Sequence, residues 1–466
     1  MSGDDLPLQN AAAIAGAVTS GKTTAAKVVD DCLHRIDALN GTLNAFTAVT
    51  AERAKAQASV VDAALAAGQP VGPLVGVPFA VKNLFDIKGL PTLAGSKINW
   101  DRAPAHADAT LVQRLEAAGA ILVGTLNMGE YAYDFTGENA HDGPSRNPHD
   151  PAHMSGGSSG GSGTAVASGM VPLALGSDTN GSIRVPASLC GLFGLKPTYG
   201  RLSRAGTFPF VASLDHVGPL ARSVEDLALS ASAMMGADPS DPVCVDRPET
   251  VLEARPSGIS GLRIAKAVGY FARQGHDEAF AAVAKVCDAL ETSATIDVPL
   301  AQEARAAAYT ITMAEGAALH LDRLKKHAAD YDPDVRDRLL AGAMIPGAWV
   351  TKAQKFRRVF QAQMYALFEE VDALIAPATP CVAPKIGQKT FTLDGVELPV
   401  RPNLGIFTQP ISFIGLPVVS VPIWLDGHAL PIGVQIIAPP WREDIALSVA
   451  QHLERAGVAH APIATH

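Results

Sequence analysis

The sequence is poor in cysteine, aromatic residues and charge. Of 466 residues, 5 are cysteines, 6% are aromatic and 18% are charged. The cysteines are scattered, odd in number and lack any Cys-x-x-Cys pair, which predicts free thiols, a cytoplasmic protein and no zinc site. Hydrophobic residues make up 48% of the chain, so it is long and apolar enough to fold around a sizeable core.

Long uncharged apolar runs and basic clusters are also missing. No apolar stretch reaches the roughly 20 residues that span a bilayer. The first ten residues are acidic and polar, so we expect neither a membrane segment nor a secretion signal. The chain has 37 basic and 46 acidic residues, a net charge of −9, which argues against a nucleic-acid partner. These absences favour a soluble, cytoplasmic protein.

Helical and strand patterns alternate along the chain. Residues 72–87 and 121–123 read as buried strands, and Thr23 or Thr24 can begin a helix that Asn40-Gly41 would end. This rhythm predicts an α/β fold with a largely parallel or mixed sheet. We expect one domain over 1–466, with N-terminal helices at 5–70, a motif-bearing core at 71–235, a mainly helical region at 240–370, and C-terminal strands and a helix at 371–460.

Two motif matches fail on their context. Gly16–Thr23 reads GAVTSGKT, a full phosphate-loop match, but an Ala-rich helical pattern precedes it where a strand is required. Both Ser158 and Ser159 satisfy G-x-S-x-G, yet the segment upstream is a loop, whereas a nucleophile elbow follows a strand. Nucleotide binding at Gly16–Thr23 therefore stays only as an alternative.

One loop is rich in possible metal ligands. It contains His141, His149 and His153 together with Asp142 and Asp150. Their spacing matches no common helical or strand ligand pattern, which favours a solvated loop over a metal site.

The stretch from Ser155 to Pro197 carries most of the chemical signal. Its Ser182 follows Thr179-Asn180-Gly181, and a Gly-rich approach lets backbone N–H groups converge beside a serine nucleophile. Lys82 is the odd residue of an apolar strand, PFAVKNLF. It is either a lysine with its head in water or one desolvated enough to act as a base.

These residues resemble the amidase signature family of serine amidohydrolases. The resemblance lies in GGSSGGSGTAVASG and LGSDTNGSIRVPASLCGLFGLKPT, with further similar blocks in the same order over about residues 5–455. It implies an α/β/α fold around a large mixed sheet covered by helices, a Ser–cis-Ser–Lys triad acting on linear amides, and no metal or organic cofactor.

Carried onto this chain, the resemblance implies that Lys82 is the base, Ser158 the relay serine after a cis peptide bond, and Ser182 the nucleophile. It implies an oxyanion hole of backbone N–H groups at Thr179, Asn180, Gly181 and Ser182. Asn180 is a departure, since many members carry glycine there. Ser159, Asp178 and Arg184 are expected to hold the loop together.

Blocks such as FTQPISFIGLPVV resemble a branch of the family that releases ammonia from a small, anionic, urea-like molecule. That branch implies a small helical partner subunit, so we expect a homodimer or heterotetramer. Tyr133, Arg184 and Gln409 are candidate donors for the substrate carboxylate, although an ion pair with Asp178 also explains Arg184. A general amidase and the glutaminase subunit of a tRNA-dependent amidotransferase remain alternatives.

Overall fold

A large mixed sheet runs through the molecule. The computed structural model describes residues 9–248 and 251–465, so residues 5–8 of the expected N-terminal segment lie outside the described residues. The sheet has 11 strands in the order β1-β3-β2-β4-β6-β5-β12-β13-β9-β7-β8, and β10 and β11 form a separate hairpin. The strands are β1 (Phe46–Val49), β2 (Pro78–Lys82), β3 (Ile121–Leu126), β4 (Leu173–Asp178), β5 (Phe193–Lys196), β6 (His216–Ala221), β7 (Ile264–Val268), β8 (Thr295–Asp297), β9 (Ala373–Pro377), β10 (Thr390–Leu393), β11 (Val396–Pro399), β12 (Val418–Ile423) and β13 (Ile432–Ile437).

Strand directions change along the sheet. β2 runs parallel to β3 and β4, β4 is antiparallel to β6, and β12 is antiparallel to both β5 and β13. At the far end β7 runs parallel to β8 and β9. The pairing of β5 with β12 joins segments from the first and last parts of the chain. The expected α/β fold with a large mixed sheet is confirmed.

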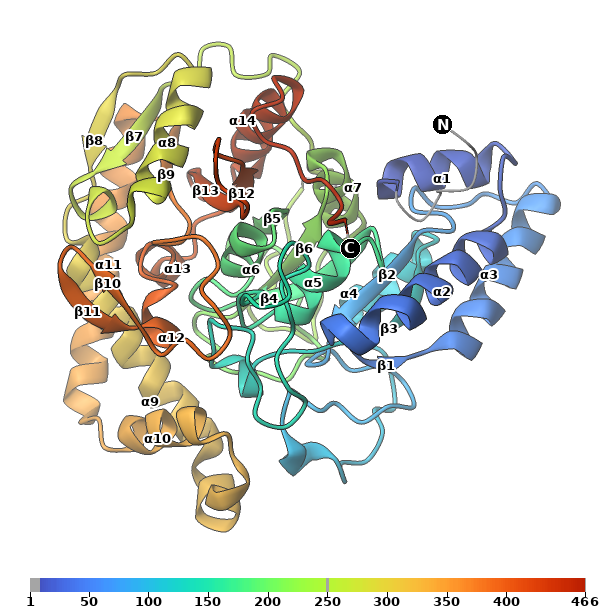
Figure 1. The fold of residues 1–466 in the computed structure, drawn as a ribbon, viewed down its shortest axis with the longest axis horizontal. Coiled ribbons are helices and arrows are strands. Elements are labelled where there is room, and N and C mark those ends of the chain that lie inside the picture. Colours follow the sequence, from blue (N-terminus) through green and yellow to red (C-terminus); the bar gives the residue numbers. More distant parts are fainter. Residues whose placement is uncertain (1–8, 249–250, 466) are drawn as a thin grey trace.

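Helices pack on the sheet along its length (Figure 1). They are α1 (Ala11–Thr19), α2 (Ala25–Leu43), α3 (Ala51–Ala66), α4 (Thr110–Ala117), α5 (Gly160–Ala167), α6 (Arg184–Leu189), α7 (Val224–Met234), α8 (Asp277–Ala289), α9 (Ala301–His327), α10 (Pro333–Ala343), α11 (Gly347–Glu370), α12 (Val400–Asn403), α13 (Gln409–Phe413) and α14 (Glu443–Arg455). α5 and α6 contact each other and lie on β4 and β5, while α7 contacts α4 and α14. α9 packs against α10, α11 and α13, at the lower left of Figure 1.

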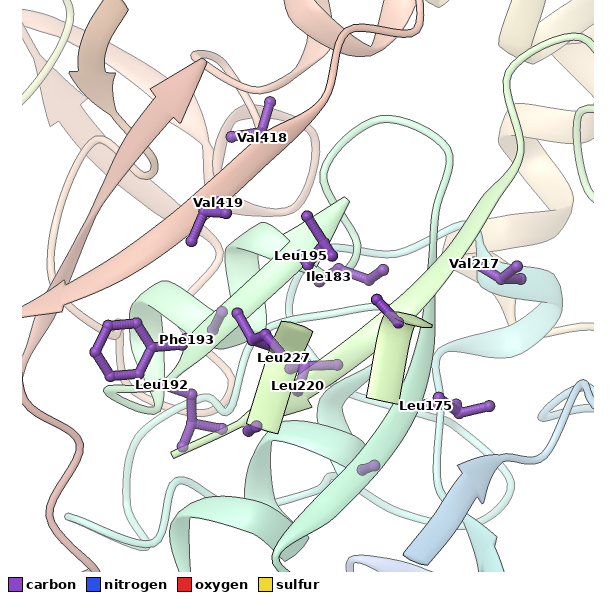
Figure 2. Close-up of a cluster of buried hydrophobic side chains, with 14 of the residues drawn as sticks. Leu175, Ile183, Leu192, Phe193, Leu195, Val217, Leu220, Leu227, Val418 and Val419 are labelled. Atoms are coloured by element: carbon purple, nitrogen blue, oxygen red, sulfur yellow. The ribbon is translucent and has the colours of Figure 1, made fainter. Parts of the chain in front are cut away.

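The centre of the sheet is a dense apolar core. Figure 2 shows side chains from β4, β5, β6 and β12 meeting there, among them Leu175, Phe193, Leu220 and Val419. All four side chains are fully buried. Strands covered on both faces read as continuous apolar runs, which explains why the sequence made these strands easy to predict. This core holds the chain ends of β2 and β4 at fixed positions, and the candidate site lies there.

The N-terminal region differs from its predicted form in three places. A strand, β1, separates α2 from α3, where the sequence suggested helices alone. Thr24 caps α2 as expected, but the helix passes through Asn40-Gly41 and ends at Leu43, with Asn44 in the left-handed conformation at φ 53°. Gly16 lies inside α1, so a helix precedes the phosphate-loop match and the nucleotide-binding alternative is wrong.

No helix of the described part of the chain is long and apolar enough to cross a membrane.

Candidate active site

Lys82 stands at the end of β2, completely buried. Its Nζ atom lies 2.6 Å from Ser158 Oγ and 2.9 Å from Ser177 Oγ, on the neighbouring strand β4. Burial lowers the pKa of Lys82 to about 7, against the opposing influence of carboxylates such as Asp178. A buried ammonium is disfavoured because it loses its hydration. Lys82 is therefore able to accept a proton near neutral pH, and two hydroxyl groups lie within its reach.

Ser158 and Ser159 lie in the loop that leads into α5. The Gly157–Ser158 peptide bond is cis, as the resemblance implies. Gly157 packs so closely that a Cβ atom there would stand 2.5 Å from a carboxylate oxygen of Asp134. Ser159 Oγ donates to the Ser177 carbonyl and accepts from the Ser177 N–H, both at 3.2 Å. These two hydrogen bonds tie the loop to β4 and agree with the bracing position expected for Ser159.

The turn from Thr179 to Ser182 connects β4 to α6. Thr408 Oγ1 donates to the Asn180 carbonyl at 2.6 Å. Gly181 has φ 145°, and a Cβ atom there would lie 2.2 Å from Thr408 Oγ1. Only glycine fits this position, since a side chain would meet both steric and conformational strain. The backbone beside Ser182 is therefore held in one arrangement.

Arg184 is corrected by the structure. Its side chain is fully buried, pairs with Asp178 at 2.9 Å, and also donates to Gln435 and Ser412. Burial raises the pKa of Asp178, but Arg184, with further help from Lys196, holds it well below its usual range. Because its guanidinium donors are used inside the core, Arg184 does not line the pocket that holds Ser182. The ion-pair alternative describes it.

Ser182 lines a pocket with about 340 Å³ of empty space. Tyr133 and Gln409, two of the predicted substrate donors, line the same pocket. The other lining residues are Ala132, Asp134, Phe135, Thr179, Asn180, Phe210, Tyr309, Thr312, Arg338 and Pro402. Lys82 and Ser158 are not lining residues and are fully buried. A substrate in this pocket would thus meet Ser182, with the lysine enclosed in the protein.

Sequence reasoning missed the cationic residues near Ser182. Arg338, on α10, sits 3.8 Å above the Tyr133 ring and donates to the Tyr133 carbonyl. Arg305, on α9, donates to Gln409 Oε1 at 2.7 Å and lines a larger outer pocket that shares Tyr309 with the inner one. Helical spacing could have linked Arg305 to Tyr309, four residues on, but not α9 to the serine loop.

The histidine-rich loop is engaged in ordinary contacts. His141 Nε2 lies 2.9 Å from a carboxylate oxygen of Glu130, and His149 Nε2 lies 3.1 Å from the Cys190 carbonyl. Within residues 9–248 and 251–465, no group of three or more His, Cys, Asp or Glu side chains is arranged to hold a metal ion.

Comparison with known proteins places this geometry in a family. The family model described as Amidase matches residues 27–447. The chain belongs to the amidase signature family. This amidase is 52% identical to AtzE, the 1-carboxybiuret hydrolase protein of Pseudomonas sp. strain ADP, over 95% of this chain and 97% of the relative. It is also 40% identical to the first of the Glutamyl-tRNA(Gln) amidotransferase subunits of Azotobacter vinelandii, over 96% of each chain.

Solved structures agree with the sequence comparison. The amidase superposes with a TM-score of 0.95 and 51% identity on a protein described as part of an unexpected vestigial complex that reveals the origins of an s-triazine catabolic enzyme. That match covers 97% of this chain and all of the other. A 6-aminohexanoate cyclic dimer hydrolase with bound substrate gives a TM-score of 0.84 at 29% identity, covering 97% of each chain. The protein is an amide-hydrolysing enzyme closely related to 1-carboxybiuret hydrolase.

Proposed function

We propose that this amidase hydrolyses a small, anionic, urea-like amide, 1-carboxybiuret, and releases ammonia through an acyl-enzyme on Ser182. The observation that carries the chemistry is the contact of the buried Lys82 Nζ with Ser158 Oγ at 2.6 Å. The substrate rests on 52% identity to a protein of 1-carboxybiuret hydrolase. A place in s-triazine breakdown follows from the same likeness.

The proposed reaction begins with proton transfer away from Ser182. Neutral Lys82 takes the proton of Ser158, which takes the proton of Ser182, and Ser182 Oγ then bonds to the carbonyl carbon. Backbone N–H groups of the turn from Thr179 to Ser182 stabilise the resulting oxyanion. Its collapse breaks the C–N bond, and the relay returns the proton to the leaving nitrogen as ammonia. Water then attacks the acyl group by the same relay, which frees the acid and restores Ser182.

The charges around the pocket favour an anionic substrate. Arg338 lines the inner pocket, and Arg305 lies where the inner and outer pockets meet. Asp134 also lines the inner pocket, but its carboxylate is paired with Arg401 at 2.8 Å. We propose that Arg338, together with Tyr133, attracts the carboxylate of the substrate, and that Gln409, which Arg305 holds in place, contributes a further polar contact.

Ammonia release from a panel of amides tests this function. We expect the purified protein to act on 1-carboxybiuret in preference to biuret, allophanate, malonamate and glutamine. Ser182→Ala removes the nucleophile and should lower kcat by about 10⁴-fold to 10⁶-fold, as replacing a catalytic serine does elsewhere. Ser168→Ala is a matched control, because this buried serine donates within α5 and lies outside the pocket. Turnover by Ser182→Ala close to that of the wild type would overturn the mechanism.

The glutaminase alternative is carried by the 40% identity to a protein of an amidotransferase. Ammonia release from glutamine alone would support it against the urea-like substrate. We also propose a homodimer or heterotetramer in the cytoplasm with a small helical partner subunit, supported by the complex described for the structural neighbour and by the five free cysteines. The mass of the purified protein in solution, with and without the co-expressed small partner, tests this assembly.

A further inference from the structure

Asn180 carries a buried amide group of which one half is used. The residue is 5% exposed and lines the same pocket as Ser182. Its Nδ2 atom donates to Thr312 Oγ1 on α9 at 2.9 Å. Its Oδ1 atom has no hydrogen-bond partner within the described residues. A buried side-chain acceptor normally has a partner, so this oxygen points to a donor that arrives with a ligand.

The position of this amide oxygen is fixed from two sides. The Asn180 carbonyl accepts from Thr408 Oγ1, and the next residue, Gly181, has no space for a side chain beside the same threonine. The Nδ2 contact with Thr312 fixes the side chain at its other end. The oxygen therefore cannot reach another partner without breaking a hydrogen bond of the turn. Such preorganisation is what a recognition site requires.

We infer that Asn180 Oδ1 accepts a hydrogen bond from an N–H group attached to the scissile carbonyl carbon. Asn180 is then a specificity-determining residue that selects amides and ureas over esters. The inference rests on the proposed function, in which Ser182 attacks that carbon and the turn faces the carbonyl oxygen. Asn180 belongs to the same turn, so the other substituents of the carbonyl carbon lie beside its side chain.

The chemistry of the acceptor decides what it recognises. Amides and ureas place a nitrogen with a hydrogen on the carbonyl carbon, whereas an ester places an oxygen without one there. An ester in this pocket leaves Asn180 Oδ1 buried and unpaired, and a site built for a hydrogen-bonding partner rejects the analogue that lacks it. The other acceptors of the pocket are engaged, since Gln409 Oε1 binds Arg305 and the Asp134 carboxylate binds Arg401.

A matched pair of substrates tests this selection. Malonamate and monomethyl malonate share one anionic acyl group and differ only in NH₂ against OCH₃ at the scissile carbonyl. The readout is the ratio of kcat/KM for the amide to that for the ester, from ammonia and methanol release. p-Nitroacetanilide and p-nitrophenyl acetate form a second pair that needs no urea-like substrate, so selection by Asn180 can be measured even if the proposed substrate is wrong.

Asn180→Leu keeps the size of the side chain and removes the acceptor. We expect its amide-to-ester ratio to fall at least about tenfold below that of the wild type, with the KM for the amide raised. Asn403→Leu is the control, because its amide oxygen already accepts from Arg305, and its ratio should stay within about threefold of the wild type. A loss of stability alone would lower both rates together and leave the ratio unchanged.

An unchanged ratio in Asn180→Leu with both substrate pairs would overturn the inference. Failure of the proposed function would look different, because Ser182→Ala would then still hydrolyse the amide whatever the ratio in Asn180→Leu.

Discussion

Lys82 and Lys196 are two fully buried lysines at the ends of strands of one sheet. Burial lowers the pKa of each to about 7, and for Lys196 the nearby Arg184 adds to the effect. Their contacts differ. Lys82 Nζ touches the hydroxyls of Ser158 and Ser177, whereas Lys196 Nζ donates to the carbonyl of Pro197 at 3.1 Å.

The comparison separates a shifted pKa from a catalytic position. A neutral lysine can take a proton only from a group that has one to give, and a carbonyl has none. Ser158 has a hydroxyl proton, and its chain neighbours lead to the pocket of Ser182. Lys196 has the same burial and the same altered pKa without such a partner. We therefore assign the base by its contacts, and the pKa supports that assignment without deciding it.

The largest expected effect comes from removing each lysine in turn. Lys82→Met should lower kcat/KM for ammonia release by about 10²-fold to 10⁴-fold, the usual contribution of a general base. Lys196→Met, the matched variant, should change it by less than about tenfold. Ammonia release and thermal unfolding of both variants provide the measurement. Equal losses of activity in two folded variants would remove the distinction between the lysines.

A smaller effect is expected from Ser177, which holds Lys82 from β4. Ser177→Ala removes a hydrogen-bond acceptor of the Lys82 ammonium, and one such bond corresponds to about a tenfold change in rate. Because the charged form loses support, the pKa of Lys82 should move down and the acid limb of the pH–rate profile should shift to lower pH.

Ser162→Ala supplies the control for Ser177→Ala. Ser162 is also a buried serine and donates to the Leu175 carbonyl of the same strand at 2.9 Å. Its loss should affect stability and leave the acid limb in place. The same shift in both variants would show that general loosening of β4, rather than the contact with Lys82, moves the limb.

The sequence predicted local features well wherever one residue type stood out from its surroundings. Lys82 was visible because a charged residue interrupts an apolar strand, and the strands themselves were visible as continuous apolar runs. The end of α2 was wrong because tertiary packing of Leu43, fully buried, carries the helix past Asn40-Gly41. Signals of this kind depend on a few neighbouring residues and can be outweighed by the core.

Contacts between distant segments could not be predicted. Arg338 donates to the carbonyl of Tyr133, 205 residues earlier in the chain, and nothing in either local sequence links them. For Arg184 the sequence left two interpretations open, a pocket donor and an ion pair with Asp178. Burial decides between them, since the guanidinium has its partners in the core. The triad positions came from the family resemblance, and their roles remain predictions.

The pH dependence of kcat/KM tests the central claim most directly, namely that Lys82 acts as the neutral base. Its lowered pKa means that the protonated form dominates below about pH 7, so activity should fall tenfold for each pH unit below that value and level off above it. The Lys196→Met variant should show the same limb. A profile that is flat from about pH 5 to about pH 9, or a limb that disappears in Lys196→Met, would contradict this assignment.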